Sequence, residues 1–154
     1  MKEYDYSKNG AYFITICTKD RECILSHIPV GTDAHIGPQK TVGTDAHIGP
    51  RVELTQIGKI AEKYILSMKC VDCYVVMPNH IHLIIILNND SNNQNISNAI
   101  RSYKILVSKE IGKSIFQSSF YDHIIRDYND YMIRVRYIQE NPVKWAYDPY
   151  HKDL

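Results

Sequence analysis

The chain has 154 residues and a formal net charge of +1, with 44% hydrophobic and 23% charged residues. These fractions are ordinary for a soluble globular protein that is long enough to form one domain with a real core. The near-neutral charge argues against a protein that coats duplex DNA, no apolar run is long enough to span a membrane, and the N-terminus lacks a signal-peptide pattern, so we expect a cytoplasmic protein without a membrane partner.

The first part of the chain predicts a strand followed by an inserted loop. Residues 11–18 (AYFITICT) are rich in β-branched and aromatic residues, which favour a strand. The segment VGTDAHIGP occurs twice, at 30–38 and 42–50, and its Gly, Pro, Thr and Asp content is typical of loops. We therefore expect a loop insertion at about 28–51 within a single domain that spans 1–154.

A helix and two strands are predicted next. Residues 54–68 have apolar residues at helical spacing, and Thr55 suits the N-cap. Residues 70–77 and 80–87 form apolar runs on either side of Pro78-Asn79, which is a turn signal. This pattern predicts two strands joined by a tight turn.

His80 and His82 stand in the first half of the second of these strands. Side chains alternate faces along a strand, so the two imidazoles point to the same side and Ile81 to the other. Two imidazoles held close together on a sheet form half of a site for a divalent metal. The alternative is that the rings face solvent or form hydrogen bonds at the sheet surface.

The second half predicts a helix from a cap at Ser97 to about Gly112 and a strand at 121–126 (YDHIIR). The expected core face of this helix consists of Ile100, Tyr103, Ile111 and either Ile105 or Leu106. Its basic residues, among them Arg101 and Lys104, make either a solvated face or a surface for phosphates.

The last predicted helix begins after Asp127 and ends at Asn141-Pro142, because the residue before proline disfavours the helical conformation. Its apolar stripe is expected to contain Tyr128, Tyr131, Met132, Val135 and Ile138.

Tyr137 lies about 160° from the centre of this stripe, with Asn141 near the same face and Arg134 one turn before. An activated tyrosine can act as a covalent nucleophile, and an amide oxygen is a hard ligand suited to Mg²⁺ or Mn²⁺. The alternative is an exposed tyrosine that stacks on a neighbouring element.

The four cysteines, Cys17, Cys23, Cys70 and Cys73, allow a further hypothesis, a small zinc protein. The spacing of Cys70 and Cys73 fits half of a zinc site, whereas the spacing of the other two fits poorly.

Four segments resemble the REP-associated tyrosine transposases, a branch of the single-tyrosine HUH transposases. They are MPNHIHLI at 77–84, YIQENPVKW at 137–145, the opening at 4–25 and FQSSFYDHIIRD at 116–127. The resemblance implies an α+β fold: a ferredoxin-like antiparallel sheet with the His pair at its centre, helices on one face and a C-terminal tyrosine-bearing helix.

The resemblance also implies a metal-dependent transposase or endonuclease acting on single-stranded DNA at hairpins. His80, His82 and Asn141 would hold Mg²⁺ or Mn²⁺, and Tyr137 would form a 5′-phosphotyrosine intermediate. The insertion-sequence members have glutamine at the position of Asn141. The alternative is a hairpin-binding relative for DNA or RNA that no longer cuts. The chain would act as a monomer or homodimer. The residues expected to contact DNA are Arg101, Lys104, Arg126, Arg134 and Arg136.

Overall fold

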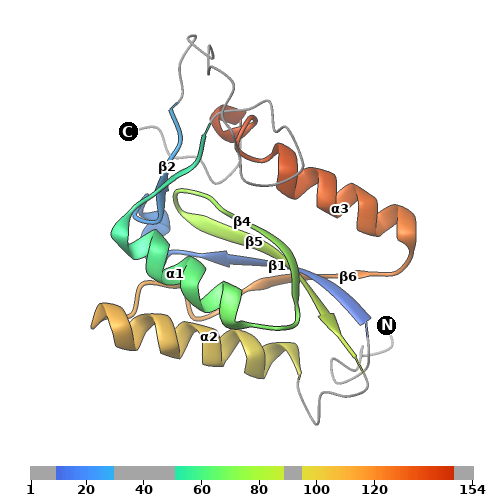
Figure 1. Cartoon of the computed structure of the whole chain (residues 1–154), viewed down its shortest axis with the longest axis horizontal. Helices are drawn as coiled ribbons and strands as arrows, with labels where there is room; N and C mark the ends of the chain where they lie inside the picture. The colour runs from blue at the N-terminus through green and yellow to red at the C-terminus, as the bar shows by residue number, and fades with distance from the viewer. Residues whose placement is uncertain (1–9, 30–50, 89–94, 148–154) are drawn as a thin grey trace.

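A computed structural model describes residues 10–29, 51–88 and 95–147 of the chain. Its centre is a four-stranded antiparallel sheet in the order β4-β5-β1-β6 (Figure 1). The strands are β1 (Gly10–Cys17), β4 (Val71–Val76), β5 (His80–Leu87) and β6 (Tyr121–Ile125). The helices are α1 (Gln56–Ser67), α2 (Ile96–Ile111) and α3 (Tyr128–Glu140).

Helices α1 and α2 cover one face of the sheet, and α3 lies over the other (Figure 1). The order β1-α1-β4-β5-α2-β6, followed by α3, is the predicted arrangement of strands and helices. The expected α+β fold with an added C-terminal helix is therefore confirmed. Among the described residues, no helix is both long and apolar enough to cross a membrane.

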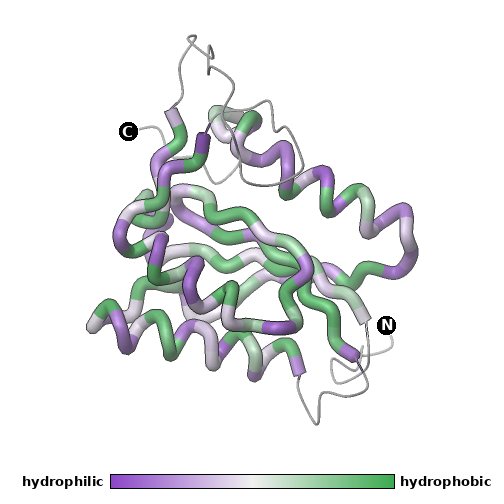
Figure 2. Tube along the Cα trace, in the orientation of Figure 1, coloured by the Kyte–Doolittle hydropathy of each residue, from purple (hydrophilic) through white to green (hydrophobic). Residues whose placement is uncertain are grey.

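Strand β5 is apolar almost throughout because both of its faces are covered (Figure 2). Ile81, Leu83 and Ile85 point into the core beneath α1 and α2, whereas Ile84 packs with Phe13 of β1 under α3. Since side chains alternate along a strand, His80 and His82 share the α3 face with Ile84. The fold thus places both imidazoles between the sheet and the C-terminal helix.

Helix α1 begins at Gln56, two residues after the predicted start. Thr55 is its N-cap as expected, and its hydroxyl accepts a hydrogen bond from the Gly58 amide at 3.0 Å. Leu54 instead belongs to the short strand β3 (Glu53–Leu54), which pairs with β2 (Ser26–His27). This ladder lies near the base of the predicted insertion, of which 30–50 lie outside the described residues.

Helix α2 differs from its prediction at the cap and on the core face. Asn95, not Ser97, is the N-cap, and its side chain accepts a hydrogen bond from the amide of Asn98 at 2.7 Å. The buried positions are Ile96, Ile100, Tyr103 and Val107. Ile105 and Leu106 are 55% and 43% exposed. Neither lies on the helix face that the four buried residues share. Gly112 ends the helix as predicted, with φ at 89°.

Helix α3 ends at Glu140, as the Asn-Pro signal predicts, but Asn141 keeps a helical backbone (φ −57°, ψ −43°). The chain turns there and continues into the 3₁₀ helix η2 (Trp145–Tyr147). Ile138 is buried and Tyr131 and Val135 pack with it, as expected. Tyr128 and Met132 are 73% and 38% exposed, so their assignment to the buried stripe is wrong. The part of the α3 surface that faces the sheet is narrower than predicted. Met132 lies at its edge, and Tyr128 is the first residue of the helix.

Candidate active site

His80 and His82 lie side by side on β5, with ring centroids 4.5 Å apart and side chains almost fully buried. Nδ1 of His82 is 2.8 Å from the Thr15 hydroxyl, which the antiparallel register places directly opposite on β1. Nδ1 of His80 is 2.8 Å from Oδ1 of Asn79 in the preceding turn. The rings therefore do not face solvent, and their Nδ1 atoms are engaged, so Nε2 is the atom through which each ring would bind a metal.

Both imidazoles are held in the neutral form. Burial lowers the pKa of His80 to about 3; the side chain of Asn141 acts in the opposite direction, and the charge of Arg21 lowers the pKa further. Burial, together with the neighbouring His80, also places the pKa of His82 well below its usual value. A neutral imidazole is the form that binds a metal. At neutral pH neither histidine would have to lose a proton before a metal binds.

Asn141 comes to the same place from the end of α3. It is buried, and its Oδ1 atom makes no hydrogen bond of standard geometry within the described part of the chain. A buried amide oxygen that lacks such a bond is unusual. The next turn of the chain brings Trp145 back over the site, where its ring centroid is 6.0 Å from that of His80.

Tyr137 is the fourth member of this group. Its ring centroid is 5.2 Å from that of His82 and 5.8 Å from that of Phe13, and the residue is 36% exposed. It therefore sits at the edge of the buried face of α3, nearer the sheet than its helical position alone suggested. The structure thus brings together the four residues predicted for metal binding and catalysis, with the tyrosine at the solvent-accessible side.

The predicted DNA-binding cations divide between the two faces of the sheet. Arg134 lies beside the site, with its guanidinium carbon 5.3 Å from the centroid of the Phe13 ring and Nε 3.4 Å from Asp130. Arg136 is exposed on the same helix, and Arg126 lies between β6 and α3.

Arg101 and Lys104 are on α2, across the sheet from the histidines. Lys104 donates hydrogen bonds to the carbonyl oxygens of Gln117 and Ser119, at 2.7 and 3.0 Å. It therefore fixes the segment before β6, and the structure does not bring these two cations to the candidate active site.

Several residues of the site were not singled out from the sequence. Thr15 and Asn79 hold the histidines, and Phe13 lies between Arg134 and the rings. Their signals are weak: Thr15 is one β-branched residue in a strand, and Asn79 is part of a turn signal. Trp145 carried a clearer signal, as the one tryptophan in the chain.

The cysteines do not form the zinc site considered above. All four are described, and none of them forms a disulfide. Within the described ranges, no group of three or more His, Cys, Asp or Glu side chains is placed to hold a metal ion. A metal at the histidine pair would therefore take its third protein ligand from another residue type, and Asn141 is so placed.

Comparisons with known proteins support the resemblance. No family model matches the chain. A Haemophilus influenzae protein whose name states no function is 27% identical and covers 99% of this chain and 91% of its own length. The REP-associated tyrosine transposase of Escherichia coli K12 is 32% identical over 54% of this chain and 56% of its own length.

A solved structure of a REP-associated tyrosine transposase bound to a REP hairpin matches with a TM-score of 0.60 and 25% identity, and the match covers 96% of this chain and 76% of that one. The relationship indicated by the motifs is thus confirmed: the chain is homologous to proteins named REP-associated tyrosine transposase and has a solved member of that group as a structural neighbour.

Proposed function

We propose that this protein cleaves and rejoins single-stranded DNA at hairpin-associated sites through a 5′-phosphotyrosine intermediate on Tyr137. The proposal rests on one observation: the partly exposed phenol of Tyr137 lies beside the buried, neutral imidazoles of His80 and His82 and the buried amide oxygen of Asn141. The solved structural neighbour is bound to a REP hairpin, which supports a DNA hairpin as the partner of this chain.

The residues present fit a divalent cation. Nε2 of His80 and of His82 and Oδ1 of Asn141 would hold it, and two nitrogen ligands with one hard oxygen are compatible with Mn²⁺ or Mg²⁺. When bound, the ion polarises a phosphate and stabilises the charge that develops on it. The buried Oδ1 atom of Asn141, which makes no hydrogen bond of standard geometry among the described residues, and the interaction of this side chain with His80 most directly support this assignment.

The chain's own residues account for the covalent step. The phenol of Tyr137 loses its proton to solvent, and its oxygen attacks the phosphorus. A bond forms between the tyrosine oxygen and the 5′-phosphate while the bond to the 3′-oxygen breaks, and that oxygen takes up a proton. Attack by the 3′-hydroxyl of the same or another strand reverses the step, so rejoining needs no external energy source.

In this proposal one copy of the chain supplies both the tyrosine and the histidines, since Tyr137 contacts His82 of its own sheet. Arg134 supplies a positive charge beside the tyrosine, and its stacking on Phe13 keeps the guanidinium in place. Arg136, which is exposed on α3, and Arg126, which is exposed just before this helix, would add contacts with DNA phosphates. A few contacts between clustered basic side chains and DNA phosphates suit a protein with a net charge of only +1.

The test is covalent capture of DNA. Labelled single strands from either flank of the protein's own gene are incubated with the protein and Mn²⁺, and the adduct is resolved on a denaturing gel. Tyr137→Phe should abolish the adduct but leave hairpin binding intact. The matched control is Tyr128→Phe, which removes a hydroxyl from a 73% exposed tyrosine of the same helix and should leave the adduct unchanged.

An adduct that persists in Tyr137→Phe would reject the assignment of the nucleophile. Hairpin binding by the unmodified protein with no adduct under any metal condition would instead support the alternative, a binding module that does not cut.

A further inference from the structure

The guanidinium of Arg134 and the ring of Tyr137 contact the same aromatic side chain. The guanidinium carbon lies 5.3 Å from the centroid of the Phe13 ring, and the tyrosine ring meets the same Phe13 ring edge-on at 5.8 Å. Phe13 is buried and stacks on the His82 ring at 5.2 Å. The guanidinium is therefore beside the place where Tyr137 would attack a phosphate.

Asp130, one turn earlier on α3, holds this guanidinium from the side of the sheet. Nε of Arg134 donates a hydrogen bond to Oδ1 of Asp130 at 3.4 Å, and Nε2 of His123 is 2.8 Å from Oδ2. The bond with His123 is the main cause that holds the pKa of Asp130 below its usual value, so the group is a carboxylate at neutral pH. Since a carboxylate only accepts hydrogen bonds, the His123 ring is the donor.

The sheet and the helix cap fix the two ends of this contact. His123 of β6 is the register partner of Phe13 of β1, and residues paired in this way point to the same face of an antiparallel sheet. The amide of Asp130 donates to the side chain of the N-cap Asp127 at 2.8 Å. The contacts thus form a closed loop from the sheet, through Asp130 and Arg134, back to Phe13.

Stability alone is a weak reason for this arrangement. An ion pair four residues apart on a helix contributes little when it is partly exposed, and the side chains of Arg134 and Asp130 are 30% and 22% exposed. Among the described residues, the hydrogen bonding of Arg134 uses only Nε. The loop of contacts therefore fixes the guanidinium while its two terminal nitrogens stay available to a ligand.

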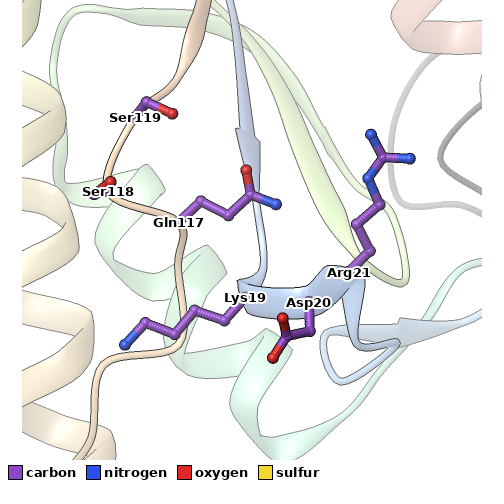
Figure 3. A pocket seen from close by; sticks show the side chains of 6 residues that line it. All are labelled: Lys19, Asp20, Arg21, Gln117, Ser118 and Ser119. Carbon is purple, nitrogen blue, oxygen red and sulfur yellow. The ribbon is translucent and has the colours of Figure 1, made fainter.

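Arg21 is another arginine near the histidines, but it approaches from a different element. It ends the 3₁₀ turn η1 (Lys19–Arg21), and Figure 3 shows its side chain projecting away from the other two side chains of the turn. Besides burial, its charge lowers the pKa of His80. Arg134 instead contacts the ring that Tyr137 also contacts, so it is the arginine placed beside the nucleophile.

We propose that Asp130, itself held by His123, is a positioning residue for Arg134. It directs the terminal nitrogens of the guanidinium to a non-bridging oxygen of the phosphate that Tyr137 attacks, which makes Arg134 a catalytic residue. The tyrosine oxygen bonds to phosphorus while the bond to the 3′-oxygen breaks, and the arginine stays protonated throughout. A donor fixed in advance stabilises the developing charge without reorganising during the reaction. The role assigned to Asp130 rests on the proposed function, because it assumes attack by Tyr137.

The test is a double-mutant cycle on the rate of adduct formation, measured with Mn²⁺ and hairpin DNA well above its Kd, so that weaker binding does not affect the rate. Arg134→Gln should lower the rate on the order of 100-fold, the loss typical of one fixed donor. Asp130→Ala leaves the guanidinium unfixed and should lower the rate by up to about 100-fold. The double variant should be no slower than Arg134→Gln alone, because Asp130 acts through Arg134.

Tyr131→Phe is the matched control. It removes another hydrogen bond between α3 and the sheet, the one to Asp72 of β4, and should keep the wild-type rate. If Asp130 only fastened α3 to the sheet, Tyr131→Phe would also slow the reaction, and the losses from Asp130→Ala and Arg134→Gln would multiply in the double variant. A wild-type rate in Asp130→Ala, or multiplied losses in the double variant, would overturn the assignment.

A second measurement follows the position of Arg134 without any cleavage. In ¹⁵N-labelled protein, the Nε–H signal of Arg134, assigned by its absence from Arg134→Gln, should exchange slowly with water. This protection should be lost in Asp130→Ala and kept in Tyr131→Phe.

The two measurements separate this assignment from the proposed function. Adduct formation by the wild type at a rate that Asp130→Ala does not change keeps the proposed function and rejects the role of Asp130. A wild type that forms no adduct rejects the proposed function and the catalytic role of Arg134 with it. In that case protection that depends on Asp130 keeps the positioning contact, and its absence overturns that as well.

Discussion

Replacing Thr15 with valine should weaken metal binding at the histidine pair without altering the shape of the sheet. The Thr15 hydroxyl is 2.8 Å from Nδ1 of His82, and the two residues are 3% and 1% exposed. Valine has nearly the same shape but cannot form this hydrogen bond. The substitution therefore isolates the effect of one hydroxyl on the orientation and tautomer of one imidazole.

The expected size follows from the burial of both groups. A buried nitrogen that loses its partner costs about 1–3 kcal/mol of the free energy of unfolding. For binding through Nε2, Nδ1 must carry the proton and donate it to the hydroxyl, so the bond also selects the ligating tautomer. Removing an outer hydrogen-bond partner of this type lowers metal affinity by about 10–100-fold, and the larger value applies if the ring reorients.

Tryptophan fluorescence offers a direct assay. Trp145 is the one tryptophan of the chain, it is buried, and its ring centroid lies 6.0 Å from that of His80. Titration with Mn²⁺ would give the affinity, and urea unfolding without metal would give the cost to the apo protein. Thr15→Ser keeps the hydroxyl and should stay close to the wild type. Equal Mn²⁺ affinities for Thr15→Val and the wild type would refute the reasoning.

Three further predictions concern the fold and the metal. Gly58→Ala should destabilise the protein by about 1–3 kcal/mol in urea unfolding, despite the gain of about 1 kcal/mol in helix propensity, because the added carbon would lie 1.8 Å from the Leu25 carbonyl oxygen; a more stable variant would contradict this. Tyr131 donates a hydrogen bond to Asp72, and this bond, together with burial, raises the pKa of Tyr131 from 10 to about 12. The stability that the raised pKa implies is fully present below pH 10 and is lost as the pH rises through 12. The free energies of unfolding of the wild type and of Tyr131→Phe should therefore converge at that pH. Chelation of divalent ions should prevent adduct formation but leave hairpin binding, and an adduct formed in excess chelator would exclude metal dependence.

The sequence predicted the parts of the site that depend on local periodicity. Alternation along a strand placed His80 and His82 on one face, and the Asn-Pro signal located the end of α3. The core face of α2 is predicted correctly at Ile100 and Tyr103 but not at Ile105 and Leu106. At about 100° per residue, Val107 falls on the face of Ile96, Ile100 and Tyr103 and is buried, whereas Ile105 lies on the opposite side and Leu106 beside that face.

The contacts that hold the site could not be predicted in the same way. The pairing of Thr15 with His82 depends on the register of β1 against β5, which joins residues 67 positions apart. The packing of Trp145 on His80 depends on the turn after α3. Neither leaves a periodic signal, because both arise from the relative placement of elements and not from the pattern within one element.

In the proposed mechanism, the position of α3 would matter more than any single side chain, because the helix carries Tyr137 and is followed at once by Asn141. The sheet supplies only the two imidazoles, so a cation held by all three ligands would connect β5 to α3. Without the cation, α3 is fastened to the sheet by the buried Ile138 and by hydrogen bonds such as that between Asp130 and His123 at 2.8 Å. A bound metal would therefore also set the distance between the nucleophile and the histidines. Loss of any ligand should lower the metal affinity and leave the phenol less firmly held beside the histidines.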